Sequence, residues 1–250
     1  MSASNFTDKS LELLVKVKET QLTNIRQAAE LAADSIKAQH LLHVFGTGHS
    51  QIIAEEAFFR AGSLIFVNAI LEPGVLLNEG GMKSGAMEKV PGLARALLTN
   101  QALQAGDTMI IVSNSGRNAV PIETAFLARE KGLKVVAITS MAHSTSVDSR
   151  HESGKKLYEL ADVVIDNCGV PGDAILSRSG VEAPFGATST LTGVFIIQAL
   201  IAETIDILAA AGLPVPVLMS ANLDGSAAYN EELFARHQQT LRRLSGLPRF

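Results

Sequence analysis

Hydrophobic residues in the first part of the chain follow a helical pattern. Residues 6–38 contain neither glycine nor proline, and apolar residues recur there at alternating steps of four and three, with Lys18 as the one misfit. The apolar positions are Leu11, Val15, Leu22, Ile25, Ala29, Ala32 and Ile36. This spacing predicts one or two helices with a heptad-like seam. The seam either covers the sheet of its own domain or contacts a second subunit.

A regular alternation of apolar runs and helical segments follows. The runs that read as strands are 40–45, 63–70, 107–112, 134–139 and 161–167. Because these runs are almost continuously apolar, we expect a parallel sheet that is covered on both faces. The predicted fold class is α/β, a three-layer αβα sandwich with a doubly wound five-stranded parallel sheet. Ligands of such a domain lie at the carboxyl ends of the strands.

The remaining segments are less regular. Residues 71–98 contain five glycines and two prolines, which predicts loops and a short helix. Residues 169–189 are expected to form a loop, 191–213 a buried helix, 214–230 a turn-rich connection and 231–244 an amphipathic helix. We therefore divide the chain into an N-terminal helical arm (1–38), a central domain (39–212) and a C-terminal tail with a closing helix (213–250).

Composition and charge exclude several classes of function. The chain has 250 residues, 47% of them hydrophobic, a mean hydropathy of +0.23 and a net charge of −4. This is enough for one sizeable domain. The acidic balance argues against nucleic acid and against an anionic membrane surface as partners. The single cysteine, Cys168, excludes an internal disulfide.

The location of the protein is predicted from two segments. The N-terminus lacks a basic stretch followed by an apolar one, so we expect no signal peptide. Residues 191–213 could imitate a membrane span, but they contain Glu203 and Asp206, which are costly in a bilayer. We expect a cytoplasmic protein that does not insert into a membrane.

Candidate chemistry lies at three junctions that follow predicted strands. These are Gly46-Thr47-Gly48-His49-Ser50, then Ser113-Asn114-Ser115-Gly116-Arg117-Asn118, and finally Thr139-Ser140. Glycines allow close approach of a ligand to the backbone, helix N-termini offer free N–H groups, and hydroxyls add donors. Each junction alone is explained by ordinary helix capping. Three of them at one sheet edge favour an anion-binding site.

Two common phosphate-binding motifs are excluded or weakened by the sequence. No GxxxxGK[ST] motif occurs, which excludes a P-loop nucleotidase. GTGHSQ has the first two glycines of a dinucleotide fingerprint, but Gln51 stands where the third belongs. A Rossmann cofactor domain is therefore disfavoured.

The three junctions together resemble the phosphosugar-binding domain of the sugar isomerase (SIS) family, which has a flavodoxin-like fold. The likeness spans about residues 10–210, and its most specific part is VSNSGRNAVPIETAFLAREKGLKVVAITS. GTGHSQIIAEE, HESGKKLYELADVVID and ANLDG resemble small stand-alone SIS proteins. The resemblance implies a phosphorylated sugar as ligand, no redox cofactor, and a homodimer or larger homo-oligomer.

Residue roles are carried over from this resemblance position by position. The implied phosphate-binding residues are Ser113, Asn114, Ser115, Gly116 and Asn118. Gly48 and Ser50 would line the rest of the pocket, and Ser140 is a weaker candidate. Some SIS enzymes bind a metal, but the six histidines here form no HxxxH or HxH pair, so we predict none.

The expected reaction is an aldose–ketose isomerisation of a sugar phosphate. It requires a base for the proton beside the carbonyl and an acid for the oxygens. The titratable residues near the loops are Glu55, Glu56, His49, Glu79 and Glu88. Glu56 is explained by an ion pair with Arg60, four residues later. We expect Glu55 as the base and His49 as the acid or a sugar ligand; a solvated carboxylate and a loop-capping histidine are the alternatives.

Two other functions remain open at this point. One is a sugar-phosphate lyase, etherase or deaminase. The muramic-acid-phosphate etherases have an acidic residue in the stretch that corresponds to 90–95, where this chain has none. The other is a non-catalytic phosphosugar sensor, although no basic helix-turn-helix pattern precedes the domain.

Overall fold

The computed structural model describes residues 1–244 and contains the predicted parallel sheet. Its five strands are β1 (Leu42–Gly46), β2 (Val67–Ile70), β3 (Thr108–Val112), β4 (Lys134–Thr139) and β5 (Val163–Asp166). They lie in the order β2-β1-β3-β4-β5, and every neighbouring pair is parallel. Chain connections leave in opposite directions from β1 and β3, so the switch point of this doubly wound sheet lies between these two strands.

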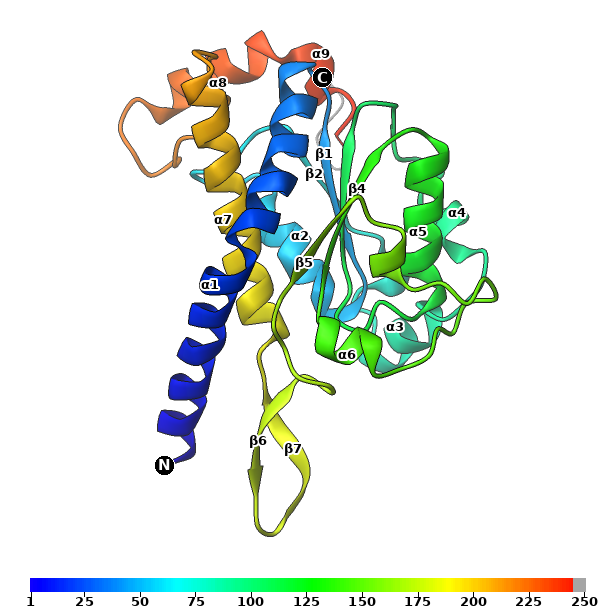
Figure 1. Cartoon of the computed structure of the whole chain (residues 1–250). Coiled ribbons are helices and arrows are strands. Elements are labelled where there is room, and N and C mark those ends of the chain that lie inside the picture. The colour runs from blue at the N-terminus through cyan, green and yellow to red at the C-terminus, as the bar shows by residue number, and fades with distance from the viewer. Residues whose placement is uncertain (245–250) are drawn as a thin grey trace.

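Helices cover both faces of the sheet (Figure 1). On one face lie α1 (Ser2–Lys37), α2 (Gln51–Ala57) and α7 (Ser189–Ala210); on the other lie α4 (Leu93–Leu97) and α5 (Ala119–Glu130). Successive strand residues alternate between these two layers, as the pleat requires. In β3, Ile110 belongs to the core under α1 and α7, and Ile111 to the core under α5. Both are fully buried, which explains the continuous apolar runs in the sequence.

The long helix α1 is partly inside and partly outside this core. Ile25, Ala29, Ala32 and Ile36 are buried in the core below α1 and α7. Leu11, Val15 and Leu22 are 55%, 50% and 56% exposed. Figure 1 shows the N-terminal half of α1 extending beyond the end of the sheet. The predicted seam thus covers its own domain in its C-terminal half and is left open in its N-terminal half.

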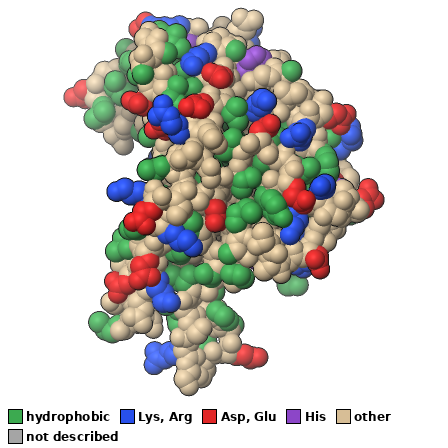
Figure 2. Space-filling view, in the orientation of Figure 1, with side chains coloured by type: hydrophobic (Ala, Val, Ile, Leu, Met, Phe, Trp, Pro, Cys, Tyr) green, Lys and Arg blue, Asp and Glu red, His purple; other side chains and the backbone are tan. Residues whose placement is uncertain are grey.

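Helix α7 is less buried than the helix predicted at 191–213. One side of it packs against α1 and α2, and Gly193 allows Ile53 of α2 to come close. Leu191 and Phe195, on its outer side, are 41% and 38% exposed. By length and composition α7 is also the one helix among residues 1–244 that could span a membrane. Figure 2 shows hydrophobic side chains lying between charged ones of both signs on the face seen in Figure 1.

The predicted loop at 169–189 is wrong. It contains a two-stranded antiparallel hairpin, β6 (Ala174–Arg178) and β7 (Val181–Ala187), which reaches past the sheet beside the N-terminal half of α1 (Figure 1). Most of its side chains face solvent, and Leu176 is the one buried residue of the two strands. A strand pair without an apolar face lacks the alternating pattern from which strands are predicted.

Smaller differences occur in two other segments. Residues 71–98 form two short helices, α3 (Gly81–Met87) and α4, where one was expected, and a further short helix, α6 (Met141–Thr145), follows β4. The closing helix begins earlier than predicted and is interrupted at His237, which gives α8 (Ser226–Arg236) and α9 (Gln238–Leu241). The backbone of His237 leaves the helical region there, with φ −112° and ψ 16°.

Candidate functional site

The first two predicted loops begin side by side at the switch point of the sheet. β1 and β3 are hydrogen-bonded neighbours, and Gly46 at the end of β1 pairs with Val112 at the end of β3. The loop at 46–50 and the loop at 113–118 therefore leave the same edge next to each other. The structure brings these two loops together at one edge of the sheet.

The first loop turns tightly over Gly46. A Cβ atom at this position would lie 2.6 Å from the backbone carbonyl of Ser50, so only glycine fits there. The N–H groups of Gly48 and His49 and the hydroxyl of Ser50 have no hydrogen-bond partner in residues 1–244. His49 is exposed and Ser50 is half-buried. The loop thus offers donors towards solvent.

The second loop is held in shape by hydrogen bonds within the loop and from the neighbouring strand β4. The N–H of Gly116 donates to Ser113 Oγ at 3.2 Å, and Thr139 Oγ1 donates to the Ser113 carbonyl oxygen at 2.7 Å. Gly116 has φ 58°, a left-handed conformation that favours glycine. Ser113 and Gly116 are buried, whereas Ser115 is half-buried. Two of the predicted phosphate residues, Ser113 and Gly116, therefore support the loop, and Ser115 remains partly exposed.

A row of free donors follows at the start of α5. The hydroxyl of Ser115 and the N–H groups of Ser115, Arg117, Asn118 and Ala119 have no partner among the described residues. Helix α5 has twelve residues, so its dipole adds partial positive charge at the same place. Unpaired N–H groups of this kind form a concave site for an anion.

Glu88 links the two loops. Its carboxylate accepts hydrogen bonds from Thr47 Oγ1 at 2.7 Å and from Asn118 Nδ2 at 2.6 Å. Its carbonyl oxygen accepts from the N–H of Val120 at 3.1 Å. Glu88 comes directly after α3. It was one of five titratable candidates and is the one that holds both loops together.

Asn114 and Asn118 have side chains that are already engaged. Asn114 Oδ1 accepts from Asn167 at 2.9 Å, and Asn118 Oδ1 accepts from Arg150 at 3.1 Å. Asn118 also occupies the N-cap position of α5. For Asn118 the group left to a ligand is therefore its N–H, and the predicted ligand roles of both residues stay predictions.

Ser140 lies beneath the surface of the site. It is fully buried, and its hydroxyl donates to the Gly169 carbonyl oxygen at 2.6 Å and accepts from the N–H of His143 at 3.1 Å. The hydroxyl thus caps α6. Its predicted contact with a sugar stays a prediction, with both hydrogen-bonding functions of the hydroxyl in use.

The other candidate carboxylates make no hydrogen bond to either loop in residues 1–244. Glu55 is exposed on α2, and its carboxylate has no partner in residues 1–244. Glu56 accepts from Arg60 at 2.7 Å, the predicted pair, and also from Gln198 at 3.1 Å. Glu79 pairs with Lys83. The structure leaves Glu55 and His49 free and engages the remaining carboxylates.

His143 is a residue at this edge that the sequence analysis missed. Partial burial and the nearby Arg117 guanidinium lower its pKa, although Asp173 opposes them. Its Nδ1 atom is buried without a partner in residues 1–244, as are Ser144 Oγ and Gln51 Oε1. The imidazole is therefore neutral at neutral pH. The signal available was its position three residues after the Ile-Thr-Ser of the third junction.

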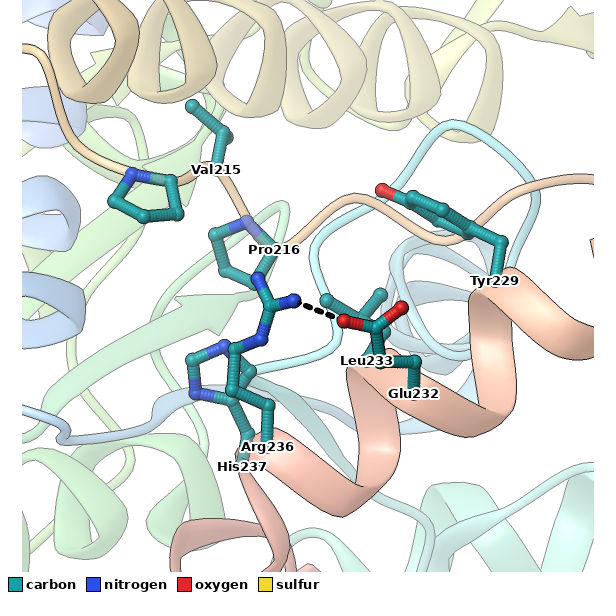
Figure 3. A pocket seen from close by; sticks show the side chains of 8 residues that line it. Val215, Pro216, Tyr229, Glu232, Leu233, Arg236 and His237 are labelled. Carbon is teal, nitrogen blue, oxygen red and sulfur yellow. Dashed lines mark hydrogen bonds and ion pairs between the residues drawn. The ribbon is translucent and has the colours of Figure 1, made fainter.

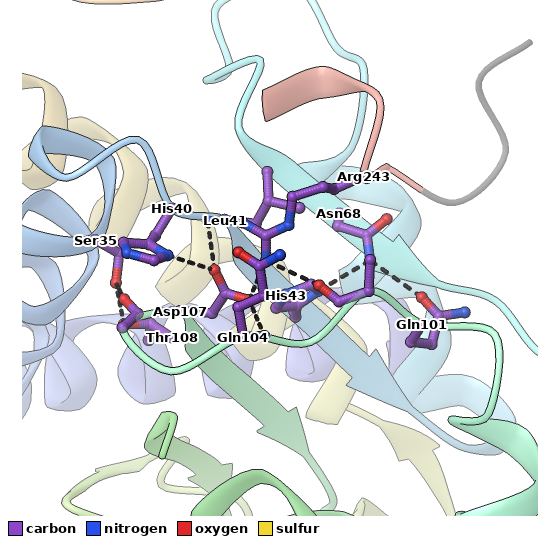
Figure 4. A network of polar contacts seen from close by, with 12 residues as sticks. Ser35, His40, Leu41, His43, Asn68, Gln101, Gln104, Asp107, Thr108 and Arg243 are labelled. Carbon is purple, nitrogen blue, oxygen red and sulfur yellow. Dashed lines mark hydrogen bonds and ion pairs between the residues drawn. The ribbon is translucent and has the colours of Figure 1, made fainter. Parts of the chain in front are cut away.

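A second polar cluster lies at the opposite, amino-terminal edge of the sheet (Figure 4). Its centre is Asp107, which is completely buried and accepts from two backbone N–H groups, Leu41 at 3.0 Å and Gln104 at 2.8 Å. The side chains of His40, His43 and Arg243 complete its shell. A carboxylate so surrounded has no free position for a ligand.

The protonation of this cluster follows from its contacts. Burial would raise the pKa of Asp107, but hydrogen bonds from His43, Leu41 and Gln104 outweigh it and hold that pKa well below its usual range. Asn68 Nδ2 donates to His43 Nδ1 at 2.9 Å, so the proton of a neutral His43 is on Nε2 and points to Asp107. Burial lowers the pKa of His43. Within the cluster, a neutral His43 thus lies beside an ionised Asp107.

In residues 1–244, no group of three or more His, Cys, Asp and Glu side chains is placed to hold a metal ion. A small open pocket lies between α8 and the segment before it (Figure 3). It is lined by Pro214, Val215, Pro216, Tyr229, Glu232, Leu233, Arg236 and His237. Arg236 and Glu232 pair with each other at its rim at 2.6 Å, and none of the loop residues contributes to it.

Comparisons with known proteins place the chain in context. A family model described as the SIS domain matches residues 5–140. A UPF0309 protein of Halalkalibacterium halodurans is 45% identical over 234 residues, which cover 92% of this chain and 97% of that protein. A UPF0309 protein of Listeria monocytogenes serotype 4b is 37% identical over 238 residues, which cover 95% and 96%.

Solved structures share the fold at low sequence identity. Phosphoheptose isomerases from Neisseria gonorrhoeae and Francisella tularensis match with TM-scores of 0.53 and 0.56 and identities of 18% and 14%. Both alignments cover 81% of this chain and 96% of the isomerase. The NanR protein of Vibrio vulnificus, complexed with ManNAc-6P, matches with a TM-score of 0.50 and 13% identity, covering 94% and 69%.

Proposed function

This chain belongs to the SIS domain family, and from that membership we propose that it binds a phosphorylated sugar and isomerises it between aldose and ketose forms. The observation that carries the proposal is the row of free N–H groups beside the Ser115 hydroxyl at the start of α5. A phosphate group matches such donors in charge and in number of acceptor oxygens. The ManNAc-6P in NanR and the names of the two isomerases support this class of ligand.

The geometry suggests how the sugar would lie. The phosphate at 115–119 fixes one end of an open-chain sugar, and the first loop, which starts beside the second, receives the hydroxyl groups at Gly48 and Ser50. Holding one end in this way brings the carbonyl and its neighbouring carbon to a set distance from the protein. Free N–H groups of the first loop can stabilise the enediolate oxygen.

Proton transfer requires a carboxylate close to these loops. We propose Glu55 as the base because its carboxylate has no partner among the described residues and lies about one helical turn after the first loop. Glu88 is proposed as a positioning residue, since its two oxygens hold Thr47 and Asn118. His49, exposed in the first loop, is the proposed acid or sugar ligand. The reaction needs no redox cofactor.

The first experiment identifies the ligand and then tests the reaction. A thermal-shift screen across phosphorylated sugars finds compounds that stabilise the native state. The best of them is incubated in heavy water, and an isomerase exchanges the hydrogen at carbon 2 for deuterium, which NMR detects. Glu55→Gln should abolish the exchange and leave binding intact, whereas Glu88→Gln should also weaken binding.

Other outcomes of this experiment favour the other functions. A tight ligand without exchange or conversion contradicts the isomerase and favours a phosphosugar sensor, for which the NanR complex is the supporting observation. Cleavage or deamination of the ligand would instead indicate a lyase, etherase or deaminase. Failure of every sugar phosphate to bind would contradict the proposed function itself.

The assembly and location are part of the same proposal. We propose a cytoplasmic homodimer or larger homo-oligomer in which the exposed Leu11, Val15 and Leu22 of α1 face a second subunit. Ile25 lies in the core of its own chain and would not take part. Leu11→Glu with Leu22→Glu should then give monomers in sedimentation, and an unchanged assembly would remove this face from the interface.

A further inference from the structure

An arginine from outside the second loop is fastened to that loop. The N–H of Arg150 donates to the Arg117 carbonyl oxygen at 2.8 Å, and Arg150 Nη1 donates to Asn118 Oδ1 at 3.1 Å. The two segments are 32 residues apart in sequence. These bonds bring a guanidinium group beside the start of α5, where the free N–H groups lie.

The positive charge at this place has no counter-charge from the described side chains. In residues 1–244, neither Arg150 nor Arg117 has a carboxylate within 4.0 Å. Arg117 Nε donates instead to the Asp148 carbonyl oxygen at 2.8 Å. Elsewhere on the surface, arginines such as Arg60, Arg95 and Arg236 pair with glutamates. The second loop therefore carries two arginines whose charge is available to a ligand.

The donors of Arg150 are also mostly unused. A guanidinium group has five N–H donors, and Arg150 spends one on Asn118. Asn118 in turn donates to Glu88, whose two oxygens are taken by neutral donors. The amide of Asn118 thus separates the carboxylate from the guanidinium group, and Arg150 stays exposed beside the start of α5.

We infer that Arg150 binds the phosphate group of the ligand and makes the site selective for doubly charged phosphate esters over singly charged esters. The inference rests on the proposed function, because it concerns the same site. Neutral N–H and hydroxyl donors recognise the oxygens of either kind of ester. An arginine adds an attraction that grows with the charge of the ligand and suits phosphate geometry.

The test compares two small probes that differ in charge. Methyl phosphate is mostly a dianion at pH 7.5, and methyl sulfate is a monoanion of nearly the same shape. Each is titrated into the ¹⁵N-labelled full-length protein, and the amide shifts of residues 115–119 report binding. We expect Arg150→Gln to weaken the binding of methyl phosphate about 10-fold and to change the affinity for methyl sulfate little, so that the preference for phosphate becomes smaller.

Two further variants separate the charge from support of the loop. Arg178→Gln removes the same charge from the exposed hairpin, where Arg178 has no ion-pair partner in the described chain, and should leave both affinities unchanged. Arg150→Lys keeps the charge and should recover part of the lost affinity. The contrary outcome is that the Arg150→Lys protein binds methyl phosphate as weakly as Arg150→Gln does, with both variants shifting the loop amide signals before any probe is added. In that case Arg150 only supports the loop and the inference is wrong.

The remaining outcomes distinguish this inference from the proposed function. If the unaltered protein binds methyl phosphate and Arg150→Gln binds it equally well, the inference fails while the phosphate site stands. If neither methyl phosphate nor any sugar phosphate binds the unaltered protein, the proposed function fails and this inference with it.

Discussion

The two edges of the sheet use similar polar residues in opposite ways. At the amino edge, five donors surround Asp107, and the carboxylate is completely buried. At the carboxyl edge, four N–H groups between residues 115 and 119 and the Ser115 hydroxyl have no partner in the described chain, while the N–H of Gly116 donates to Ser113. The carboxylate at the amino edge has its hydrogen bonds satisfied within the protein, whereas the donors at the carboxyl edge remain available to a ligand.

This difference shows that residue type alone does not identify a functional site. A histidine, an aspartate and an arginine in contact, as at the amino edge, are also the members of many catalytic sites. Here Asp107 and His43 are completely buried, and their side-chain atoms are hydrogen-bonded within the protein, so they stabilise the fold. At the carboxyl edge, half-buried Ser115 has a hydroxyl and an N–H group without partners in residues 1–244, as do the backbone N–H groups of Arg117, Asn118 and Ala119, and such unmet donors favour binding. Accessibility and unmet hydrogen bonds decide between the two.

The largest expected effect is the loss of stability when the buried carboxylate of the amino edge is removed. Asp107→Ala removes a buried carboxylate and leaves its donors unpaired, which should lower the free energy of unfolding by about 3–5 kcal/mol. Urea denaturation measures this loss. Asp206→Ala, on the exposed side of α7, is the control and should change stability by less than about 0.5 kcal/mol. A similar small loss for both variants would mean that the cluster contributes little.

An intermediate effect is expected when two serines of the carboxyl edge are compared. Ser115→Ala should weaken sugar-phosphate binding by about 1.5–3 kcal/mol and leave stability unchanged, because its hydroxyl is free to meet the phosphate. Ser140→Ala should lower the free energy of unfolding by about 1–3 kcal/mol, because the Gly169 carbonyl and the His143 N–H lose their partner. Calorimetric titration and urea denaturation measure the two quantities. If a stable Ser115→Ala protein kept its affinity for the sugar phosphate, the second loop would serve only as a helix cap.

The smallest expected effect is the response of the filled edge to acid. Burial holds the pKa of His43 below its ordinary value of 6.5, so below pH 6.5 the unfolded chain takes up a proton that the native state does not. Stability should therefore fall as the pH drops from 6.5, by at most about 1.4 kcal/mol per pH unit for this one group. The imidazole signal of His43 in NMR should titrate with a midpoint below 6.5. A midpoint above 6.5 would show that Asp107 keeps His43 charged instead.

The sequence predicted the carboxyl edge and missed the amino edge for a physical reason. Glycine and serine directly after an apolar strand are local signals, and parallel strands bring such junctions to one edge. The partners of Asp107 are spread along the chain, and Arg243 lies 136 residues away from it. No spacing rule relates them, because the contact exists only once the tail has packed on the sheet.

The same distinction explains the remaining successes and failures. Strands such as 134–139 were predicted because burial on both faces leaves an apolar run. The hairpin at 174–187 was missed because its strands face solvent, and the open side of α7 because a helix that is apolar all round does not show which side is covered. Glu88 was a candidate near the loops, but its role in linking them was not predicted, and Arg150 was not considered, since only the fold brings these contacts about.

The contact between Arg243 and Asp107 also has a consequence for how the protein is made. The ribosome adds residues from the N-terminus onward, so all five strands have emerged while position 243 is still to be synthesised. Until then the buried aspartate lacks its one arginine partner, and the sheet is less stable than in the finished chain. A chain released before this residue keeps that deficit permanently, which makes prematurely terminated products easier for cellular proteases to unfold and degrade than complete ones.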